Sequence, residues 1–197
     1  MKILLTPISY NKSIFRSFFP LLTADERSYV RKFTSFKRAY ESLIARIIIK
    51  KYLGVDGIGQ TKDGQPYLPD SPYYVSISHC EGYVMVAYSN CKIGVDLELQ
   101  QPLLEGTEYF MSSYEQKIFK QEAQQLWLIK EAYSKWCSLG FRGIDPQKIQ
   151  CKKKNDQWTI QKEHCFVKTE KYGELSYAFV SSQEKVSKLI LVEEKYL

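Results

Sequence analysis

A pair of acidic residues near the middle of the chain is the first feature that could do chemistry. Asp96 and Glu98 alternate with apolar residues between positions 93 and 98, and this period of two predicts a strand with one apolar face. Both carboxylates then leave the same face, about 7 Å apart along the strand, and repel each other unless a cation lies between them. Gly94, just upstream, leaves room for another group beside the backbone. The alternative is an edge strand with a solvated acidic face.

A helix predicted over residues 124–139 carries a third carboxylate. Trp127, Glu131 and Lys135 are four residues apart and therefore form one stripe along the helix. The alternative is an ordinary amphipathic helix with an i,i+4 Glu–Lys pair. That alternative explains less well why Lys130 adjoins the pair beside a large apolar side chain.

Three carboxylates without a nearby histidine or thiolate favour a hard cation, and Mg²⁺ is the usual choice. Asp96, Glu98 and Glu131 would supply oxygen ligands, because Mg²⁺ takes one or two protein carboxylates together with phosphate oxygens. Lys130 and Lys135 would complement phosphate charge. These residue types together indicate phosphoryl-type transfer, in which catalysis is mostly positioning and charge neutralisation.

Four segments, in the same order, resemble the signature of the 4′-phosphopantetheinyl transferases. The resemblance rests first on Gly-Val-Asp-Leu-Glu at 94–98 and Trp-Leu-Ile-Lys-Glu-Ala-Tyr-Ser-Lys at 127–135. Val-Ser-Ile-Ser-His at 75–79 and Phe-Met-Ser-Ser-Tyr-Glu at 110–115 match two further segments of the family. Length and layout resemble the larger, surfactin-synthetase-activating type.

The resemblance implies an α+β fold made of two similar halves, a pseudo-repeat within one chain. Each half would hold a small, mostly antiparallel sheet packed on a long helix, with the active site in the cleft between the halves. The first half would be 1–100, with the Asp96/Glu98 strand, and the second 101–197, with the Trp127–Lys135 helix. Such a layout favours a monomer.

The resemblance also implies a reaction. A serine hydroxyl of an apo acyl or peptidyl carrier protein attacks the β-phosphorus of coenzyme A, the co-substrate, and 3′,5′-bisphosphoadenosine leaves. Asp96, Glu98 and Glu131 would hold Mg²⁺, with Mn²⁺ as the other candidate ion. Glu131 is the candidate base for the serine proton, with metal-bound water as its competitor. The candidate catalytic residues are thus Glu131, Asp96 and Lys135. The candidate coenzyme A contacts are His79, Ser78, Lys135, Lys130, Lys37, Arg38, Arg46 and Lys62.

Several of these positions have a structural alternative. Without the resemblance, His79 would be interpreted as a structural histidine. The family's Gly-Lys-Pro is Gly-Gln-Pro at 64–66, so one basic contact to coenzyme A is missing, and Lys62 is the candidate to compensate. Glu115 is either a further ligand or a helix residue. A solvated basic face is the alternative for the residues near the first long helix, Lys37, Arg38 and Arg46.

Composition narrows the classes of partner. The charge of +6, from 28 Lys and Arg against 22 Asp and Glu, suits an anionic ligand or an acidic partner and is too mild to argue for nucleic acid. Five cysteines without a CxxC pair favour neither a disulfide framework nor a structural zinc site. The sequence has no signal-peptide pattern and no apolar run long enough for a bilayer, so we expect no membrane association and a cytoplasmic location.

Two other functions compete with the transferase. One is a catalytically inactive homologue that binds coenzyme A or a carrier protein, and the intact carboxylate set Asp96, Glu98 and Glu131 argues against it. The other is an unrelated metal-dependent phosphohydrolase, which the lack of a histidine cluster and of a P-loop disfavours. The carrier would serve fatty acid, polyketide or nonribosomal peptide biosynthesis, and these alternatives stay open.

Overall fold

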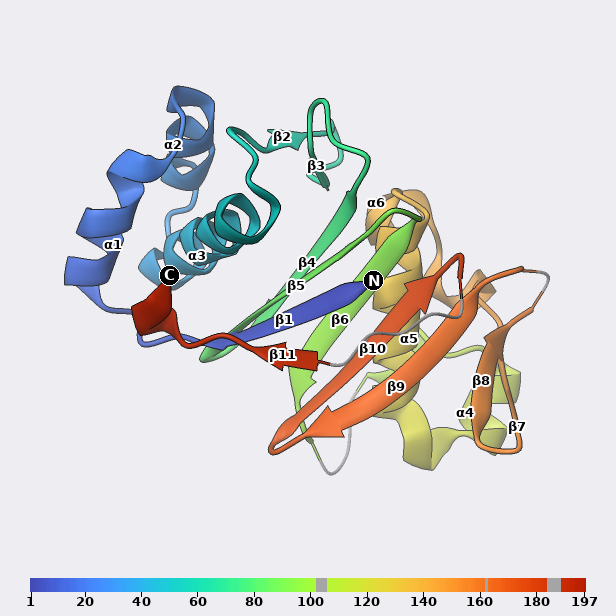
Figure 1. The fold of residues 1–197 in the computed structure, drawn as a ribbon. Helices are drawn as coiled ribbons and strands as arrows, with labels where there is room; N and C mark the ends of the chain where they lie inside the picture. The colour runs from blue at the N-terminus through green and yellow to red at the C-terminus, as the bar shows by residue number, and fades with distance from the viewer. Residues whose placement is uncertain (102–105, 162, 184–188) are drawn as a thin grey trace. The chain divides into compact units, whose positions relative to one another are not determined.

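The chain divides into two compact units. The computed structural model describes residues 1–101, 106–161, 163–183 and 189–197 (Figure 1). The first unit contains Met1–Asn90 together with β11 (Leu189–Leu191) and the segment that follows it, and the second unit begins at Cys91.

A mixed sheet and three helices make up the first unit. Among the described residues the strand order is β11-β1-β5-β4, in which β1 is parallel to β11 and antiparallel to β5, and β4 is antiparallel to β5. The elements are β1 (Lys2–Pro7), α1 (Lys12–Phe18), α2 (Ala24–Arg31), α3 (Phe36–Leu53), the small pair β2 (Gly59–Gln60) and β3 (Pro66–Tyr67), β4 (Tyr74–Cys80) and β5 (Tyr83–Ser89).

Helix α3 is the long helix of the first unit, and its apolar side packs on the sheet. Ile44 and Ile48 are fully buried in one cluster with Val84 and Val86 of β5. The helix ends where Gly54 takes a left-handed conformation (φ 64°), which a residue without a Cβ adopts at little cost. Helix α3 is thus the first long helix that the sequence predicted near Lys37, Arg38 and Arg46.

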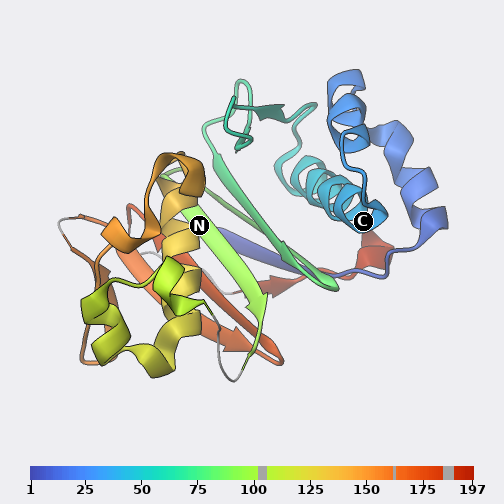
Figure 2. The same ribbon diagram turned by 180° about the vertical axis from the view of Figure 1, so that it is seen from behind.

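The second unit combines a three-stranded antiparallel sheet, as far as the described residues show, with helix α5. The sheet order is β6-β10-β9, and a separate hairpin is formed by β7 and β8. Helix α5 packs along β6 and β10, as Figures 1 and 2 show from opposite sides. The elements are β6 (Ile93–Leu99), α4 (Ser113–Ile118), α5 (Ala123–Trp136), the short α6 (Gly140–Gly143), β7 (Cys151–Lys154), β8 (Gln157–Ile160), β9 (Phe166–Tyr172) and β10 (Leu175–Ser181).

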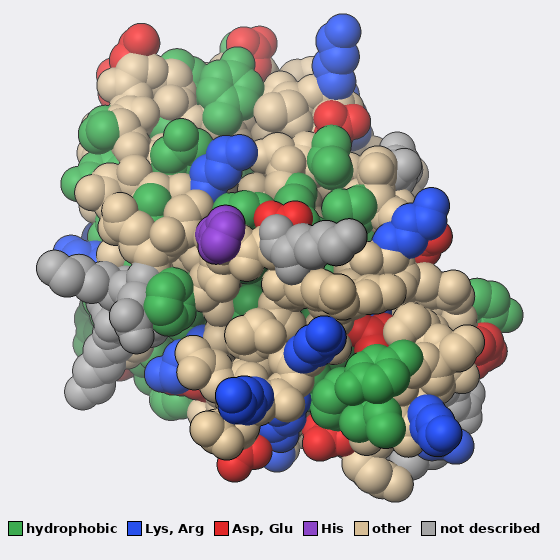
Figure 3. Space-filling view, turned by 90° about the vertical axis from the view of Figure 1, so that its right-hand side faces the viewer, with side chains coloured by type: hydrophobic (Ala, Val, Ile, Leu, Met, Phe, Trp, Pro, Cys, Tyr) green, Lys and Arg blue, Asp and Glu red, His purple; other side chains and the backbone are tan. Residues whose placement is uncertain are grey.

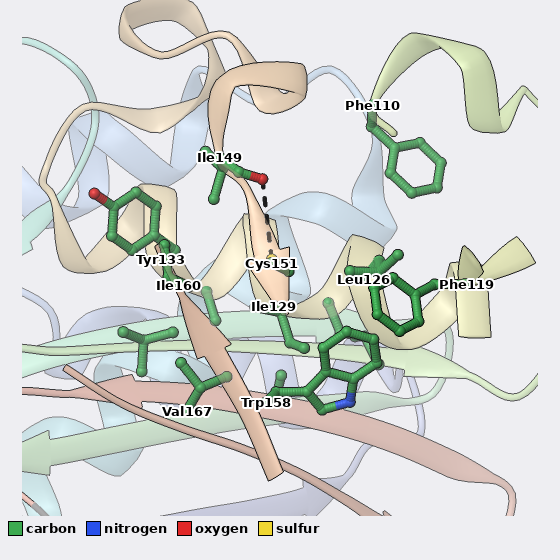
Figure 4. Close-up of a cluster of buried hydrophobic side chains, with 14 of the residues drawn as sticks. Phe110, Phe119, Leu126, Ile129, Tyr133, Ile149, Cys151, Trp158, Ile160 and Val167 are labelled. Carbon is green, nitrogen blue, oxygen red and sulfur yellow. Dashed lines mark hydrogen bonds between the residues drawn. The ribbon is translucent and has the colours of Figure 1, made fainter. Parts of the chain in front are cut away.

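One hydrophobic cluster holds α5, the sheet and the hairpin of the second unit together (Figure 4). Leu126 and Ile129 of α5 are fully buried in it. The ring of Trp158, from β8, lies 5.0 Å from the ring of Phe119. The cluster fixes α5 against the sheet, where the helix packs along β6 and β10.

The strand that carries Asp96 and Glu98 belongs to the second unit, which corrects the predicted division at 100/101. The units divide between Asn90 and Cys91, because every residue of β6 pairs with β10 and α5 packs on the same two strands. The α+β class is confirmed, and all three candidate carboxylates lie within one unit. The similarity of the two halves stays a prediction.

Two further observations concern the surface. Among the described residues, no helix combines the length and the apolar character that a membrane crossing requires. On the face drawn in Figure 3, basic and acidic side chains are interspersed, in keeping with the modest net charge of +6.

Candidate active site

Helix α5 approaches strand β6 so closely that only glycine fits at position 94. A Cβ added to Gly94 would lie 1.9 Å from the carbonyl oxygen of Ala132 and 2.6 Å from the amide nitrogen of Trp136. Residues two apart on a strand share a face, so Asp96 and Glu98 leave β6 on the side that α5 covers. The glycine therefore brings both carboxylates to the helix that carries the third.

Lys135 of α5 meets the buried carboxylate of Asp96. The ammonium nitrogen lies 2.7 Å from Asp96 Oδ1 and 3.1 Å from the carbonyl oxygen of Val95. The Asp96 side chain is 7% exposed and that of Lys135 is 25% exposed. A charge-assisted hydrogen bond of this kind is short and strong, so it holds the helix and the strand in one register.

Glu131 lies one turn before Lys135 on α5, and its pKa is shifted by the charged groups around it. The pKa of this carboxyl is raised to about 7, mainly by burial and also by the negative charges of Asp96 and Glu98, while Lys135 acts to lower it. The three predicted carboxylates and the lysine therefore form one electrostatic group, which we call the carboxylate cluster. Trp127, which shares the stripe, packs between the rings of Phe110 and Phe141 in the core.

Gln124, at the start of α5, was not predicted as a functional residue. Its side chain forms hydrogen bonds at the C-terminal end of β6. Its side-chain amide donates to the carbonyl oxygen of Leu99 (2.6 Å) and accepts from the amide of Gln101 (3.4 Å). Both partners directly follow Glu98 in the chain. A glutamine at the start of a helix has no sequence signal for this contact, because its partners are main-chain groups of another element.

The residues of the cluster suit a hard divalent cation, although they are not arranged as a finished metal cage. Among the described residues, no group of three or more His, Cys, Asp or Glu side chains is positioned to hold a metal ion. The donors are carboxylate oxygens, the class that Mg²⁺ prefers, and the raised pKa of Glu131 expresses a repulsion that a cation would relieve. The predicted Mg²⁺ ligands Asp96, Glu98 and Glu131 thus fit the ion in chemical type, and the site itself stays a prediction.

Lys130, predicted as a phosphate contact, lies outside the carboxylate cluster and in the core of the second unit. Its side chain is completely buried, and the ammonium group donates to Glu115 Oε2 (2.7 Å) and to the carbonyl oxygens of Phe110 (2.8 Å) and Pro146 (2.9 Å). The three N–H donors of the Lys130 ammonium group therefore each have an acceptor. Residues adjacent on a helix point about 100° apart, so Lys130 turns into the core while Glu131 turns toward β6.

Glu115 is the structural partner of Lys130, and this resolves the alternatives left open for it. Glu115 completes a capping box with Ser112 at the start of α4 and also accepts from the amide of Cys151 (2.9 Å). The carboxylate is completely buried. It joins α4, α5 and the start of β7, and its oxygens are occupied by these contacts rather than directed at a ligand.

The first unit places two of the predicted coenzyme A contacts, Arg38 and His79, beside the buried carboxylate of Glu41, which was not predicted. Arg38 of α3 donates to His79 Nδ1 (2.6 Å) and lies 3.2 Å from Glu41 Oε2. His79 Nδ1 is 3.3 Å from the same oxygen. Lys37 pairs with Glu81, which follows β4 in the turn to β5. The three-residue spacing of Arg38 and Glu41 on the helix was the signal available in the sequence.

The remaining predicted contacts do not join this group. Arg46 is buried, donates to the carbonyl (3.0 Å) and hydroxyl (2.7 Å) of Ser42, and lies over the ring of Tyr29. Neither phosphate contact nor a solvated face describes it. Ser78 is buried on the face of β4 opposite to His79, since the two are adjacent in a strand. Lys62 is exposed in the turn between β2 and β3.

The sequence is similar to curated 4′-phosphopantetheinyl transferases, and no protein-family model matches it. The "4'-phosphopantetheinyl transferase gsp" of Aneurinibacillus migulanus is 30% identical over 56% of this chain and 53% of its own length. A "4'-phosphopantetheinyl transferase" of Bacillus subtilis is 28% identical over 60% of this chain and 61% of its own length. The "4'-phosphopantetheinyl transferase Sfp" of Bacillus subtilis strain 168 is 25% identical, with the same two shares.

The chain covers between 53% and 61% of the length of these relatives. Four curated proteins with this name match, which confirms the resemblance that the four motifs predicted. The chain is therefore similar, over 56% to 60% of its length, to proteins named 4′-phosphopantetheinyl transferase.

Proposed function

We propose that this protein transfers the 4′-phosphopantetheine group of coenzyme A to a serine hydroxyl of an apo acyl or peptidyl carrier protein. The observation that carries the proposal is the carboxylate cluster, in which Asp96 and Glu131 share one electrostatic site with Lys135 on the closely packed β6–α5 pair. The similarity to relatives of that name supports the same activity.

Each residue of the cluster has a role in the proposed reaction. Asp96, Glu98 and Glu131 would hold Mg²⁺, or Mn²⁺, which supplies charge neutralisation to a pyrophosphate. Glu131, with a pKa near 7, is suited to accept the proton of the serine hydroxyl at neutral pH. The serine oxygen forms its bond to the β-phosphorus of coenzyme A, and the bond from that phosphorus to 3′,5′-bisphosphoadenosine breaks. Lys135 would stabilise the phosphate charge.

The first unit would contribute the contacts to coenzyme A. Lys37, Arg38 and His79 form a group with two positive side chains and a histidine, which suits a phosphate. Glu41 and Glu81 hold these side chains in place. We propose further that the enzyme is of the larger type and acts as a monomer in the cytoplasm.

Mass spectrometry of a carrier protein tests the proposal. After incubation with coenzyme A and Mg²⁺, the carrier should gain about 340 Da, the mass of one phosphopantetheine group. Asp96→Ala and Glu131→Ala should abolish the gain while the circular dichroism spectrum stays that of the wild type. Lys120→Ala is the control, because Lys120 is exposed and lies outside the cluster.

The other outcomes separate the competing functions. A carrier set from fatty acid, polyketide and nonribosomal peptide synthesis that gains no mass would favour an inactive homologue that binds coenzyme A or a carrier. Phosphate release without a carrier would favour a phosphohydrolase. Near-normal turnover of Asp96→Ala would show that the site is misplaced.

A further inference from the structure

Lys135 occupies the position in the carboxylate cluster where a cation would be expected. Three carboxylates lie within electrostatic reach of one another, and the ammonium group of Lys135 donates to Asp96 Oδ1 at 2.7 Å. The same nitrogen also donates to the main chain, at the carbonyl oxygen of Val95 (3.1 Å). An ammonium group so placed neutralises part of the cluster's charge.

We propose that Lys135 is the internal counter-ion of the carboxylate cluster and competes with a divalent cation for Asp96, so that cation binding releases its ammonium group. The inference rests on the proposed function for the identity of the ion. It extends that function by assigning Lys135 two successive partners: Asp96 in the cation-free protein, and the phosphate groups of the substrate once the cation is bound.

Electrostatics opposes the binding of the two positive groups to the same carboxylate. Mg²⁺ lies about 2.1 Å from a carboxylate oxygen and keeps a strict octahedral shell, so an ammonium group bonded to the same oxygen would lie within about 4 Å of the ion. A divalent and a monovalent positive charge at that distance repel strongly, even near a protein surface. The ammonium group of Lys135 can move from Asp96 toward solvent, because the Lys135 side chain is 25% exposed whereas that of Asp96 is 7% exposed.

The same contact explains why the cluster is not a finished metal cage. With Asp96 bonded to Lys135, the described residues offer no group of three or more ligand side chains in a metal-binding arrangement. The carboxylate of Asp96 is held by the helix instead. Cation binding would then exchange one positive partner for another without leaving a buried charge uncompensated.

Binding of Mn²⁺, followed by electron paramagnetic resonance, tests the competition without any need for turnover. Lys135→Gln should bind Mn²⁺ about tenfold to hundredfold more tightly than the wild type, because one opposing charge is removed from the site. Lys120→Gln carries the same change of charge on an exposed lysine outside the cluster and should bind as the wild type does. Equal or weaker binding by Lys135→Gln overturns the proposal, and so does a complete lack of Mn²⁺ binding by both proteins.

A second measurement uses the wild type alone and therefore does not depend on whether the variant folds. Trace acetylation of lysines, mapped by peptide mass spectrometry, should modify Lys135 several-fold faster after Mn²⁺ is added, relative to Lys120. An unchanged or slower rate contradicts the release of the ammonium group. The carrier mass assay is independent of both readouts, so a wild type that modifies its carrier upholds the proposed function even where this inference fails.

Discussion

Replacing Gly94 by alanine tests the packing that assembles the candidate site. The added Cβ would lie 1.9 Å from the carbonyl oxygen of Ala132, whereas ordinary contact begins at 3.4 Å, so the strand and the helix would have to separate by about 1.5 Å (3.4 − 1.9). The contacted atoms belong to the main chain and cannot rotate away. Overpacking of this kind costs about 3 kcal/mol of unfolding free energy, which corresponds to a fall in melting temperature of roughly 6 to 12 °C.

Activity should suffer more than stability. Glu131 and Lys135 lie on either side of the contact on α5, so a helix that moves away from β6 carries both of them away from Asp96. A misplacement of about 1 Å in an active site can cost about 100-fold in rate. We therefore expect the transfer rate of Gly94→Ala to fall about 100-fold in protein that is still folded at 20 °C.

Thermal unfolding and the carrier mass assay measure the two effects, and Gly57→Ala is the matched control. A Cβ at Gly57 would meet only Thr23 Cγ2, at an ordinary 3.7 Å, and the residue does not have a positive φ. Its melting temperature and rate should stay close to the wild type. If Gly94→Ala melts with Gly57→Ala and transfers at the wild-type rate, then β6 and α5 are not in the close contact that the argument requires.

Three further predictions concern single residues. Lys130→Met should lower the free energy of unfolding by about 3 to 5 kcal/mol in denaturant titration, because it leaves the buried carboxylate of Glu115 without its ion-pair partner. A stable variant whose KM for coenzyme A rises would instead support a role for Lys130 in phosphate binding. Folding raises the pKa of Glu131 from 4.5 to about 7, so the folded protein holds this proton more tightly than the unfolded chain does. Stability should therefore fall as pH rises from about 4.5 through about 7. With a chelator present, Glu131→Gln should be about 2 kcal/mol more stable than the wild type at pH 8, after allowance for partial exposure of the carboxyl. At pH 4 the two proteins should be equally stable. The same pH dependence in both proteins would refute the assignment. Gln65→Lys should lower the KM for coenzyme A several-fold if the missing lysine of the Gly-Gln-Pro segment matters, and an unchanged KM would show that it does not.

Local patterns in the sequence predicted most individual elements. The alternation around Asp96 predicted β6, and the helix predicted over 124–139 corresponds to α5. Periodicity and capping depend on residues that are neighbours in the chain, so the sequence contains this information directly. Pairing is different: β6 follows β5 in the chain but pairs with β10, about 80 residues later.

The roles of the lysines on α5 show the same limit. Lys130 and Lys135 are both basic, lie five residues apart, and fall within one motif. The fold sends the first into a buried pair with Glu115 and the second to Asp96. Nothing in their types or spacing distinguishes them, because the difference lies in what the neighbouring elements place around each side chain.

The amino-acid sequence by itself determined the α+β class, the acidic strand, the helical stripe and the relationship to a transferase superfamily, since each follows from residue types and short spacings. Only the tertiary structure decided that Glu131 and Lys135 share a site with Asp96, that Lys130 and Glu115 belong to the core, and that β6 is part of the second unit. The physical reason is that packing between distant segments sets burial, charge contacts and the room beside Gly94, and these quantities do not exist until the chain has folded.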